Sequence, residues 1–307
     1  MTDRNASSAT AIADAKPRWG QLRMTRDTKR SLTLLSPTLV LLLLALTLPI
    51  LMLIVLSFWT QVGMNLTPGF TLENYATFFD RRIFPVLLQR SIENSAMVAV
   101  LTVLLAYPAA YFVAFRVQKR KILWLILITL PFWTSYLLRI FAWKVILGYN
   151  GVINSGFISI GLIEEPLTFL LNNRGAVVIT LAHAWAAFAI LPIYVSLEKI
   201  DRSLLEAAAD LGESPLWSFL RVTLPLSLPG VIASALLVFI PTVGDYVAPN
   251  LVGGTNGLMI GNLVQTQFGR GNNWPLGASI SIISMIVITG VVCVFLLLVH
   301  QLRKKLA

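Results

Sequence analysis

Charged residues and cysteine are both scarce in this 307-residue chain. Asp, Glu, Lys and Arg make up only 12% of it, whereas a soluble domain typically carries about 25%. The single cysteine, Cys293, excludes an internal disulfide and a metal site made of several thiolates. Because Cys293 lies in an apolar run, we expect it to be a small packing residue. So little charge in so long a chain favours lipid over water as the surrounding solvent.

Catalytic and nucleotide-binding motifs are also missing. The sequence contains no G-x-x-x-x-G-K-[ST] phosphate loop, no H-E-x-x-H motif and no pattern typical of a Ser–His–Asp triad. Its two histidines, His183 and His300, stand alone among apolar residues, and packing is their favoured role because a metal site needs several ligands. The sequence therefore predicts that this chain binds no metal or cofactor and is not an enzyme.

Long hydrophobic runs are what the chain has in excess. Hydrophobic residues form 56% of it and gather in six runs, each near the roughly 20 residues that a helix needs to cross a bilayer. The runs cover about residues 34–58, 92–115, 122–147, 176–197, 226–247 and 276–299. The sequence predicts an all-α, polytopic membrane protein with six transmembrane helices.

Positive charge is unevenly distributed along the chain, whose net charge is +10. Lys and Arg cluster at the ends of hydrophobic runs without any nucleic-acid-binding motif, so membrane lipid and not nucleic acid is the expected partner. With both termini inside, the cytoplasmic segments hold 17 of the 24 Lys and Arg residues, as the positive-inside rule requires. Residues 1–31 lack the hydrophobic region of a secretory signal. We therefore expect 1–31 and 303–307 to be cytoplasmic tails, the first of them disordered.

Two long segments, 60–80 and 148–175, then lie outside, and the second is predicted to contain a short interfacial helix near 152–160. The expected organisation places a first transmembrane helix and outer segment in 32–89 and a core transmembrane domain in 90–302. No internal repeat of 20–50 residues is visible, which disfavours a secondary transporter built from inverted repeats.

A polar stretch, LEAAADLGESPLWSFLRVTLPLSLPG, interrupts the hydrophobic runs after residue 204. Ser203 is expected to cap a first helix, with Glu206 completing a capping box. Gly212 suits the left-handed conformation that ends such a helix. Ser214 and Pro215 then suit the cap and first position of a second short helix, which is expected to end before Pro225. The result is a rigid helix–turn–helix on the cytoplasmic side.

The charge of this element favours a protein partner over the membrane surface. Residues 198–221 carry five acids and three bases, and an acidic helix is repelled by anionic lipid. Ala207 and Ala208 are small enough for a partner to approach the backbone closely. Trp217 and Phe219 are bulky side chains of the type that dominates protein interfaces.

The same residues resemble the EAA loop of ABC importer permeases, whose pattern is E-A-A, three residues, G, nine intervening positions, an apolar residue and a later L-P. The matching residues are Glu206, Ala207, Ala208, Gly212, Val222, Leu224 and Pro225. The resemblance implies a type I ABC importer permease fold. It also implies that the loop of about residues 198–225 couples the membrane spans to a cytosolic ATPase dimer, which binds ATP and Mg²⁺.

Much of the chain from 90 to 302 resembles the permeases of spermidine/putrescine importers. The stretches that carry this are LPFWTSYLLRIFAW, SLEKIDRSLLEAAADLGESP, FIPTVGDYVAPNLVGG and NWPLGAS. Permeases for iron, opines and other small, amino-acid-like solutes share parts of these patterns and remain alternatives. The resemblance implies a bacterial inner-membrane subunit that works with a second, homologous permease and a periplasmic solute-binding protein.

Charged residues within membrane spans are costly and are treated as functional candidates. Asp245, near the outer half of the fifth run, is the strongest candidate to meet an ammonium group, with Tyr246 beside it. Glu93 is a second carboxylate, and Tyr136 and Trp143 offer rings for cation–π contacts. The alternative for Asp245 is a helix cap or an ion pair within the protein, for example with Arg139 or Lys144.

Overall fold

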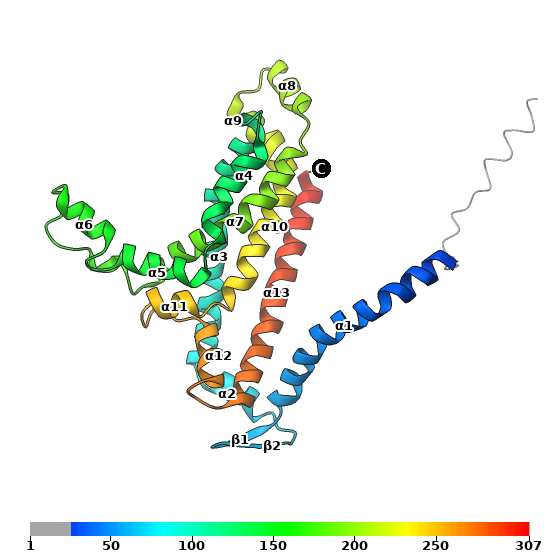
Figure 1. The fold of residues 1–307 in the computed structure, drawn as a ribbon, viewed down its shortest axis with the longest axis vertical. Coiled ribbons are helices and arrows are strands. Elements are labelled where there is room, and N and C mark those ends of the chain that lie inside the picture. Colours follow the sequence, from blue (N-terminus) through cyan, green and yellow to red (C-terminus); the bar gives the residue numbers. More distant parts are fainter. Residues whose placement is uncertain (1–25, 307) are drawn as a thin grey trace, which may run out of the picture. The chain divides into compact units, whose positions relative to one another are not determined.

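The computed structural model describes residues 26–306, whose regular secondary structure is helical apart from one hairpin (Figure 1). They fall into two units that divide at Met52–Leu53. Helix α1 (Arg26–Ser57) supplies all the described residues of the first unit. Most of the predicted tail 1–31 lies outside the described residues, but its last six residues form the start of α1.

The second unit begins with a short antiparallel hairpin that the sequence did not predict. Strand β1 (Thr60–Val62) pairs with β2 (Asn65–Thr67), with Thr60 opposite Thr67. Helix α2 (Glu73–Asp80) follows and buries Phe78. The Asn74 side chain donates to the carbonyls of Ser57 and Trp59, which fixes α2 to the end of the preceding helix.

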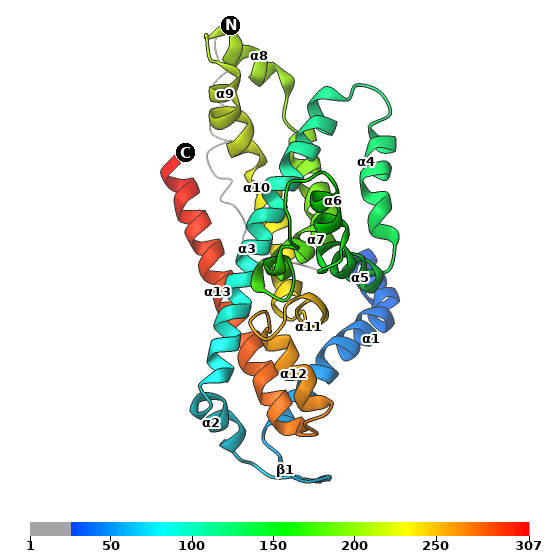
Figure 2. The same cartoon turned by 90° about the vertical axis from the view of Figure 1, so that its left-hand side faces the viewer.

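Three long helices, α3 (Ile83–Tyr111), α7 (Arg174–Glu198) and α10 (Leu224–Val243), pack against one another and form the core of the second unit (Figure 2). Their buried faces are rich in alanine, serine and threonine, which allows close helix packing in a membrane. Ser234 of α10 donates a hydrogen bond to the Ala189 carbonyl of α7 at 2.7 Å. The last long helix, α13 (Trp274–Leu306), includes residues 303–306 of the predicted tail and carries Cys293, which is exposed and not packed.

Six helical stretches are long and apolar enough to cross a membrane, as predicted, but the third lies elsewhere. The predicted run 122–147 is broken into α4 (Lys121–Thr129) with a 3₁₀ turn, η2 (Leu130–Trp133), and α5 (Tyr136–Leu147). The backbone is extended at Thr134 and Ser135, so the helix cannot continue. The Thr134 hydroxyl donates to the Pro131 carbonyl at 2.8 Å, satisfying an acceptor at the break.

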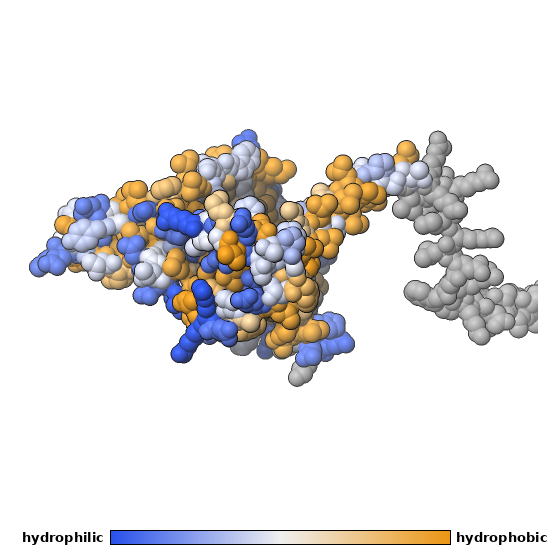
Figure 3. All heavy atoms as spheres, turned by 90° about the horizontal axis from the view of Figure 1, so that it is seen from below, coloured by the Kyte–Doolittle hydropathy of each residue, from blue (hydrophilic) through white to orange (hydrophobic). Residues whose placement is uncertain are grey.

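Helix α5 instead continues toward α6 (Val152–Ser159), and together they form the third stretch, Tyr136–Ser159. Helix α6 confirms the short helix predicted near 152–160. In Figure 1 this pair projects sideways from the core helices. Figure 3 looks at the end of the second unit that carries α2, and hydrophilic residues gather on this face and on the projecting pair.

Two further short helices lie between the fifth and sixth stretches: α11 (Val247–Val252) and α12 (Ile260–Phe268). Neither was predicted, because the fifth hydrophobic run was expected to continue to residue 247. The Asn262 side chain accepts from the Met259 N–H and donates to the Tyr246 carbonyl, so it fixes both helices to each other. The Ser91 hydroxyl of α3 accepts from the Ile260 N–H at 2.7 Å, which anchors α12 to the core.

Candidate functional site

The EAA loop, residues 198–225, lies at one end of the second unit, opposite to α2 (Figure 1). Its first helix, α8, runs over Arg202–Asp210. The predicted cap was wrong: Asp201, not Ser203, caps α8 by accepting from the Ser203 N–H at 3.0 Å. A carboxylate is favoured there by the partial positive charge of the helix start. The Ser203 contact correspondingly lowers the pKa of Asp201.

The turn after α8 confirms the predicted end of this helix and the predicted start of the next. Gly212 has a φ of +83°, in the left-handed region, and its N–H donates to the Ala209 carbonyl at 2.9 Å. The Glu213 N–H donates to the Ala208 carbonyl at 3.0 Å, so the last carbonyls of α8 are satisfied. The Ser214 hydroxyl accepts from the Trp217 N–H, and Pro215 is the first residue of the next helix.

The second helix of the loop does not end before Pro225, as had been predicted. Helix α9 (Pro215–Ser218) leads into a π-helical turn, η4 (Phe219–Thr223), which continues directly into α10. Proline lacks an N–H, and its ring crowds the carbonyl four residues earlier. The wider π turn just before Pro225 accommodates this, with the Leu224 N–H donating to the Phe219 carbonyl. The second half of the loop, from Pro215, is therefore the beginning of the fifth membrane-spanning stretch.

The candidate docking side chains of the loop do not all face the same way. Glu206, Ala207, Pro215 and Trp217 are exposed, whereas Ala208 is buried. Phe219 packs edge-on against Tyr107 and Tyr111 of α3, with ring centroids 5.6 and 6.1 Å away. Phe219 thus fixes the loop to the core helices, and Trp217 is the aromatic residue left on the surface.

Four exposed leucines around the turn were missed by the sequence analysis: Leu204, Leu211, Leu216 and Leu220. Leu211 is 85% exposed and Leu216 is 65% exposed, although both belong to an otherwise polar segment. Leucines within a polar segment were the signal by which the sequence could have indicated this surface. Arg221 lies over the Trp217 ring at 4.8 Å and pairs with Glu213, so it fixes the orientation of the tryptophan. The loop thus presents an apolar surface with acidic residues beside it.

Asp245 lies where α10 ends and α11 begins. One carboxylate oxygen accepts from the N–H groups of Val247 and Ala248 at 2.8 and 3.1 Å, so it caps α11. The other oxygen accepts a hydrogen bond from the Tyr136 hydroxyl of α5. The structure therefore shows a cap and a tyrosine contact, not the ion pair with Arg139 or Lys144 that had been considered. Asp245 and Tyr136, two of the candidate path residues, are in direct contact.

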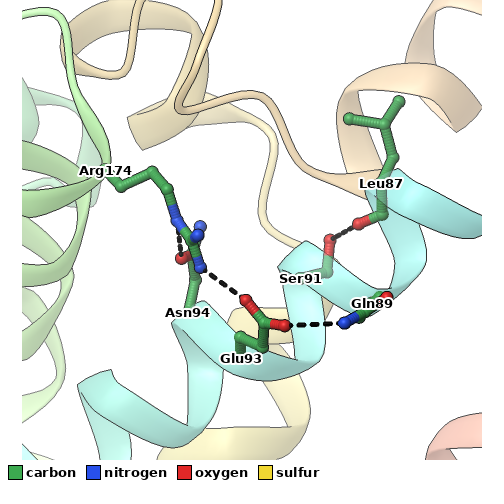
Figure 4. Close-up of polar contacts among 6 residues, drawn as sticks. All are labelled: Leu87, Gln89, Ser91, Glu93, Asn94 and Arg174. Atoms are coloured by element: carbon green, nitrogen blue, oxygen red, sulfur yellow. Dashed lines mark hydrogen bonds and ion pairs between the residues drawn. The ribbon is translucent and has the colours of Figure 1, made fainter. Parts of the chain in front are cut away.

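Glu93, the second candidate carboxylate, has a different environment (Figure 4). Its side chain pairs with Arg174 of α7 at 2.9 Å and accepts from Gln89 at 2.9 Å. Arg174 also donates to the Asn94 side chain at 2.9 Å, which joins α3 to the start of α7. Among the described residues, no hydrogen bond or ion pair joins this group to Asp245, and Arg174 already balances the charge of Glu93.

The aromatic candidates divide in a similar way. Tyr246 is 45% exposed, beside Asp245. Trp143 is half-buried, and its ring lies 5.5 Å from that of His183, which also contacts Phe132. Arg139 lies over the Phe132 ring at 5.4 Å and donates to the Phe132 carbonyl. Trp143 thus belongs to a cluster of rings, and His183 contacts two of them although it is exposed. The described residues contain no grouping of His, Cys, Asp and Glu that could hold a metal ion.

Comparison with known proteins identifies the family of this chain. Residues 31–306 match the family described as "Binding-protein-dependent transport system inner membrane component". The chain is 39% identical over 260 residues to the spermidine/putrescine transport system permease protein PotB of Escherichia coli K12, covering 84% of this chain and 94% of that protein. It is 38% identical over 235 residues to PotB of Haemophilus influenzae, covering 76% and 82%.

The fold also matches a solved structure. A chain of the bacterial alginate ABC transporter, in complex with an alginate pentasaccharide-bound periplasmic protein, superposes with a TM-score of 0.66 at 18% identity. The match covers 92% of this chain and 99% of that chain, so the two share a fold. The chain is a member of the binding-protein-dependent transport family, and it is the non-catalytic, multi-pass inner-membrane permease subunit of an ABC importer.

Proposed function

We propose that this permease subunit forms part of the path by which a polyamine, spermidine or putrescine, enters the cell. The observation that carries the proposal is the identity of 38–39% to two spermidine/putrescine permeases over 76% and 84% of the chain. Iron, opine and amino-acid permeases are the competing assignments within the same family.

The environment of Asp245 supports a cationic solute. Its partners are a hydroxyl and two backbone amides, all neutral, and none of the described Lys or Arg residues forms an ion pair with it. The negative charge therefore remains available to an ammonium group, with which a carboxylate forms strong, charge-assisted hydrogen bonds. The exposed ring of Tyr246 adds a face for a cation–π contact. Glu93 is the weaker candidate because Arg174 already balances its charge.

The EAA loop provides the proposed contact with the ATPase. Its exposed leucines and Trp217 form an apolar surface, and such surfaces on a polar segment mark protein contacts. In this proposal the ATPase dimer binds ATP and Mg²⁺, and a second homologous permease completes the path. Both termini and the EAA loop are on the cytoplasmic side, and a periplasmic binding protein delivers the solute to the opposite side.

Asp245→Asn tests the solute. Asparagine retains an oxygen that can cap α11, so the fold should persist while the charge is lost. We expect the KM for spermidine uptake to rise about tenfold or more, since a hydrogen bond between charged groups contributes on the order of 1.5–3 kcal/mol. The measurement is uptake of radiolabelled spermidine by cells that express the complete transporter and lack other polyamine importers. Asp80→Asn, at an exposed carboxylate of α2, is the matched control. Wild-type kinetics in Asp245→Asn would contradict the role of this carboxylate.

Competition measurements separate polyamines from the other solutes. The uptake of labelled spermidine by the complete transporter is measured with an excess of putrescine, ferric iron chelate, an opine or an amino acid. We expect putrescine alone to compete strongly. If spermidine is not taken up at all, or another solute is transported in its place, the polyamine assignment is wrong even though the subunit remains an importer permease.

Glu206→Lys tests the EAA loop. Glu206 is exposed on α8 and forms no ion pair among the described residues, so the reversal of its charge should leave the fold intact. We expect uptake to fall by at least tenfold, because a misplaced interface charge costs several kcal/mol. Asp80→Lys makes the same charge change at the other end of the unit and serves as the control. Uptake and the amount of ATPase that co-purifies are both measured; normal values of both in Glu206→Lys would refute the contact.

A further inference from the structure

A groove lies between the end of α10, helix α12 and helix α13, and neither the sequence motifs nor the comparisons assign it a role. It encloses about 590 Å³. That volume is within the roughly 300–1,000 Å³ of typical small-molecule sites. Gly244 and Tyr246, the two neighbours of Asp245 in the chain, both line it. The groove therefore lies beside the chain segment that carries Asp245, whose own carboxylate is held by Tyr136 and the first N–H groups of α11.

The hydroxyl groups along α13 give the groove its chemical character. Ser281, Ser284 and Thr289 line it from positions three to five residues apart on one helix. Each hydroxyl donates its proton to a backbone carbonyl of α13, at 2.8, 2.7 and 2.7 Å respectively. A hydroxyl whose proton is used in this way retains its oxygen lone pairs, so it acts toward a ligand as an acceptor. The stripe thus offers acceptors and suits an N–H donor.

The remaining lining favours a chain of methylene groups that carries amines. None of the described residues that line the groove is charged, and apolar side chains, including Met285, form most of its walls. Tyr246 supplies an exposed ring, and Gln265 supplies an amide that can accept or donate. An anionic solute would meet mainly acceptors there, which are repulsive to it. A second groove, between α3, α10 and α13, is lined only by aliphatic, alanine and phenylalanine side chains and offers no such acceptors.

Gln265 also lines a smaller polar cavity with Asn250, Thr266 and Arg270. The guanidinium of Arg270 disfavours an ammonium group in that cavity, whereas none of the residues that line the groove carries a positive charge. A cationic chain is therefore favoured in the groove over the smaller cavity.

We propose that this groove is the subsite that holds the polyamine as it crosses the subunit, with the Tyr246 ring at one ammonium group and Ser281, Ser284 and Thr289 accepting from further N–H groups. This inference rests on the proposed function and deepens it, because it assigns the solute to particular side chains. It predicts that the hydroxyl stripe of α13 is reached by small cations from water.

Thiol labelling of the complete transporter tests the groove directly. Ser281→Cys is nearly isosteric and is made in a Cys293→Ser background, which removes the single native thiol. We expect the cationic reagent 2-aminoethyl methanethiosulfonate to react faster than its anionic 2-sulfonatoethyl analogue. Spermidine at ten times its half-saturating concentration should slow the reaction about tenfold by occupying the site. The control is the wild-type chain, which retains Cys293. This thiol does not line the groove, and spermidine should not slow its labelling.

Transport kinetics give an independent measurement. Thr289→Val removes an acceptor, and we expect it to raise the KM for spermidine about fivefold to tenfold, as the loss of a hydrogen bond to a charged group does. Thr47→Val is the matched control, because the Thr47 hydroxyl of α1 also donates to the carbonyl four residues earlier. Unprotected labelling of Ser281→Cys together with an unchanged KM in Thr289→Val would overturn the inference while spermidine uptake continues. If the wild-type transporter takes up no polyamine, the proposed function fails, and the polyamine occupant of the groove fails with it.

Discussion

Replacement of Gly212 by proline is expected to abolish ATP-dependent uptake while the chain remains inserted in the membrane. Proline fixes φ near −65°, whereas Gly212 has a φ of +83°. Proline also lacks the N–H that Gly212 donates to the Ala209 carbonyl. The turn between α8 and α9 cannot form with this residue, so the exposed surface of the EAA loop is lost. Because the change lies outside the helices of the core, the membrane-spanning segments should still assemble.

A matched variant separates the turn from the mere loss of glycine. Gly212→Asn retains the N–H, and asparagine adopts the left-handed conformation more readily than most residues. Nothing lies within 4 Å of the position where its Cβ would be. We expect Gly212→Asn to transport at close to the wild-type rate. Uptake, the amount of chain in the membrane fraction and the co-purification of ATPase are measured for both variants, and normal uptake by Gly212→Pro would show that the turn is dispensable.

Gly230→Leu is expected to prevent the core of the second unit from folding. A Cβ at this position of α10 would lie 2.4 Å from the Pro192 carbonyl oxygen and 2.6 Å from the Ser196 Cβ, both on α7. These contacts are well inside van der Waals distance, and one of them is to backbone, which cannot rotate away. Overpacking of a core ordinarily costs about 1–3 kcal/mol. A full side chain between two backbones should exceed this cost, so little folded protein is expected.

Gly290→Leu is the control for this helix packing. Gly290 is also a glycine within a long membrane-spanning helix, but nothing lies within 4 Å of its Cβ position. Both variants change the hydrophobicity of a span by the same amount. Thermal unfolding in detergent and the monodisperse yield on size exclusion are compared with those of the wild type. Equal stability of the two variants would show that the close approach of α7 and α10 does not hold in the assembled protein.

Local signals predicted the EAA loop well where one residue decides the conformation. The left-handed turn at Gly212 and the start of α9 at Ser214 and Pro215 follow from the chemistry of those residues alone. The prediction that the second helix ends before Pro225 was wrong. A π turn of five residues precedes this proline and accommodates its ring, so the helix continues into α10. The rule that a helix ends before a proline does not predict a π turn that lets the helix continue.

Tertiary contacts decided the features that the sequence could not predict. The break at Thr134 and Ser135 separates two apolar segments that read as one run, and α11 and α12 depend on Asn262 and Ser91, which act across the fold. Asp245 was identified as a candidate from its charge in an apolar run. Its partner, Tyr136, lies 109 residues away in the chain, and hydropathy carries no information about such a pairing.

The continuity of α9, η4 and α10 has a mechanical consequence. From Pro215 to Val243 the chain is one helical rod of 29 residues, about 40 Å long at 1.5 Å per residue. Trp217 lies near one end of this helical segment, and Asp245 is the second residue after the other end. Gly244 is the single residue between the helix and Asp245, so a tilt of the helix at the tryptophan is expected to move the carboxylate as well. In the proposed mechanism, one helical segment therefore connects the residue that contacts the ATPase with the residue that contacts the solute.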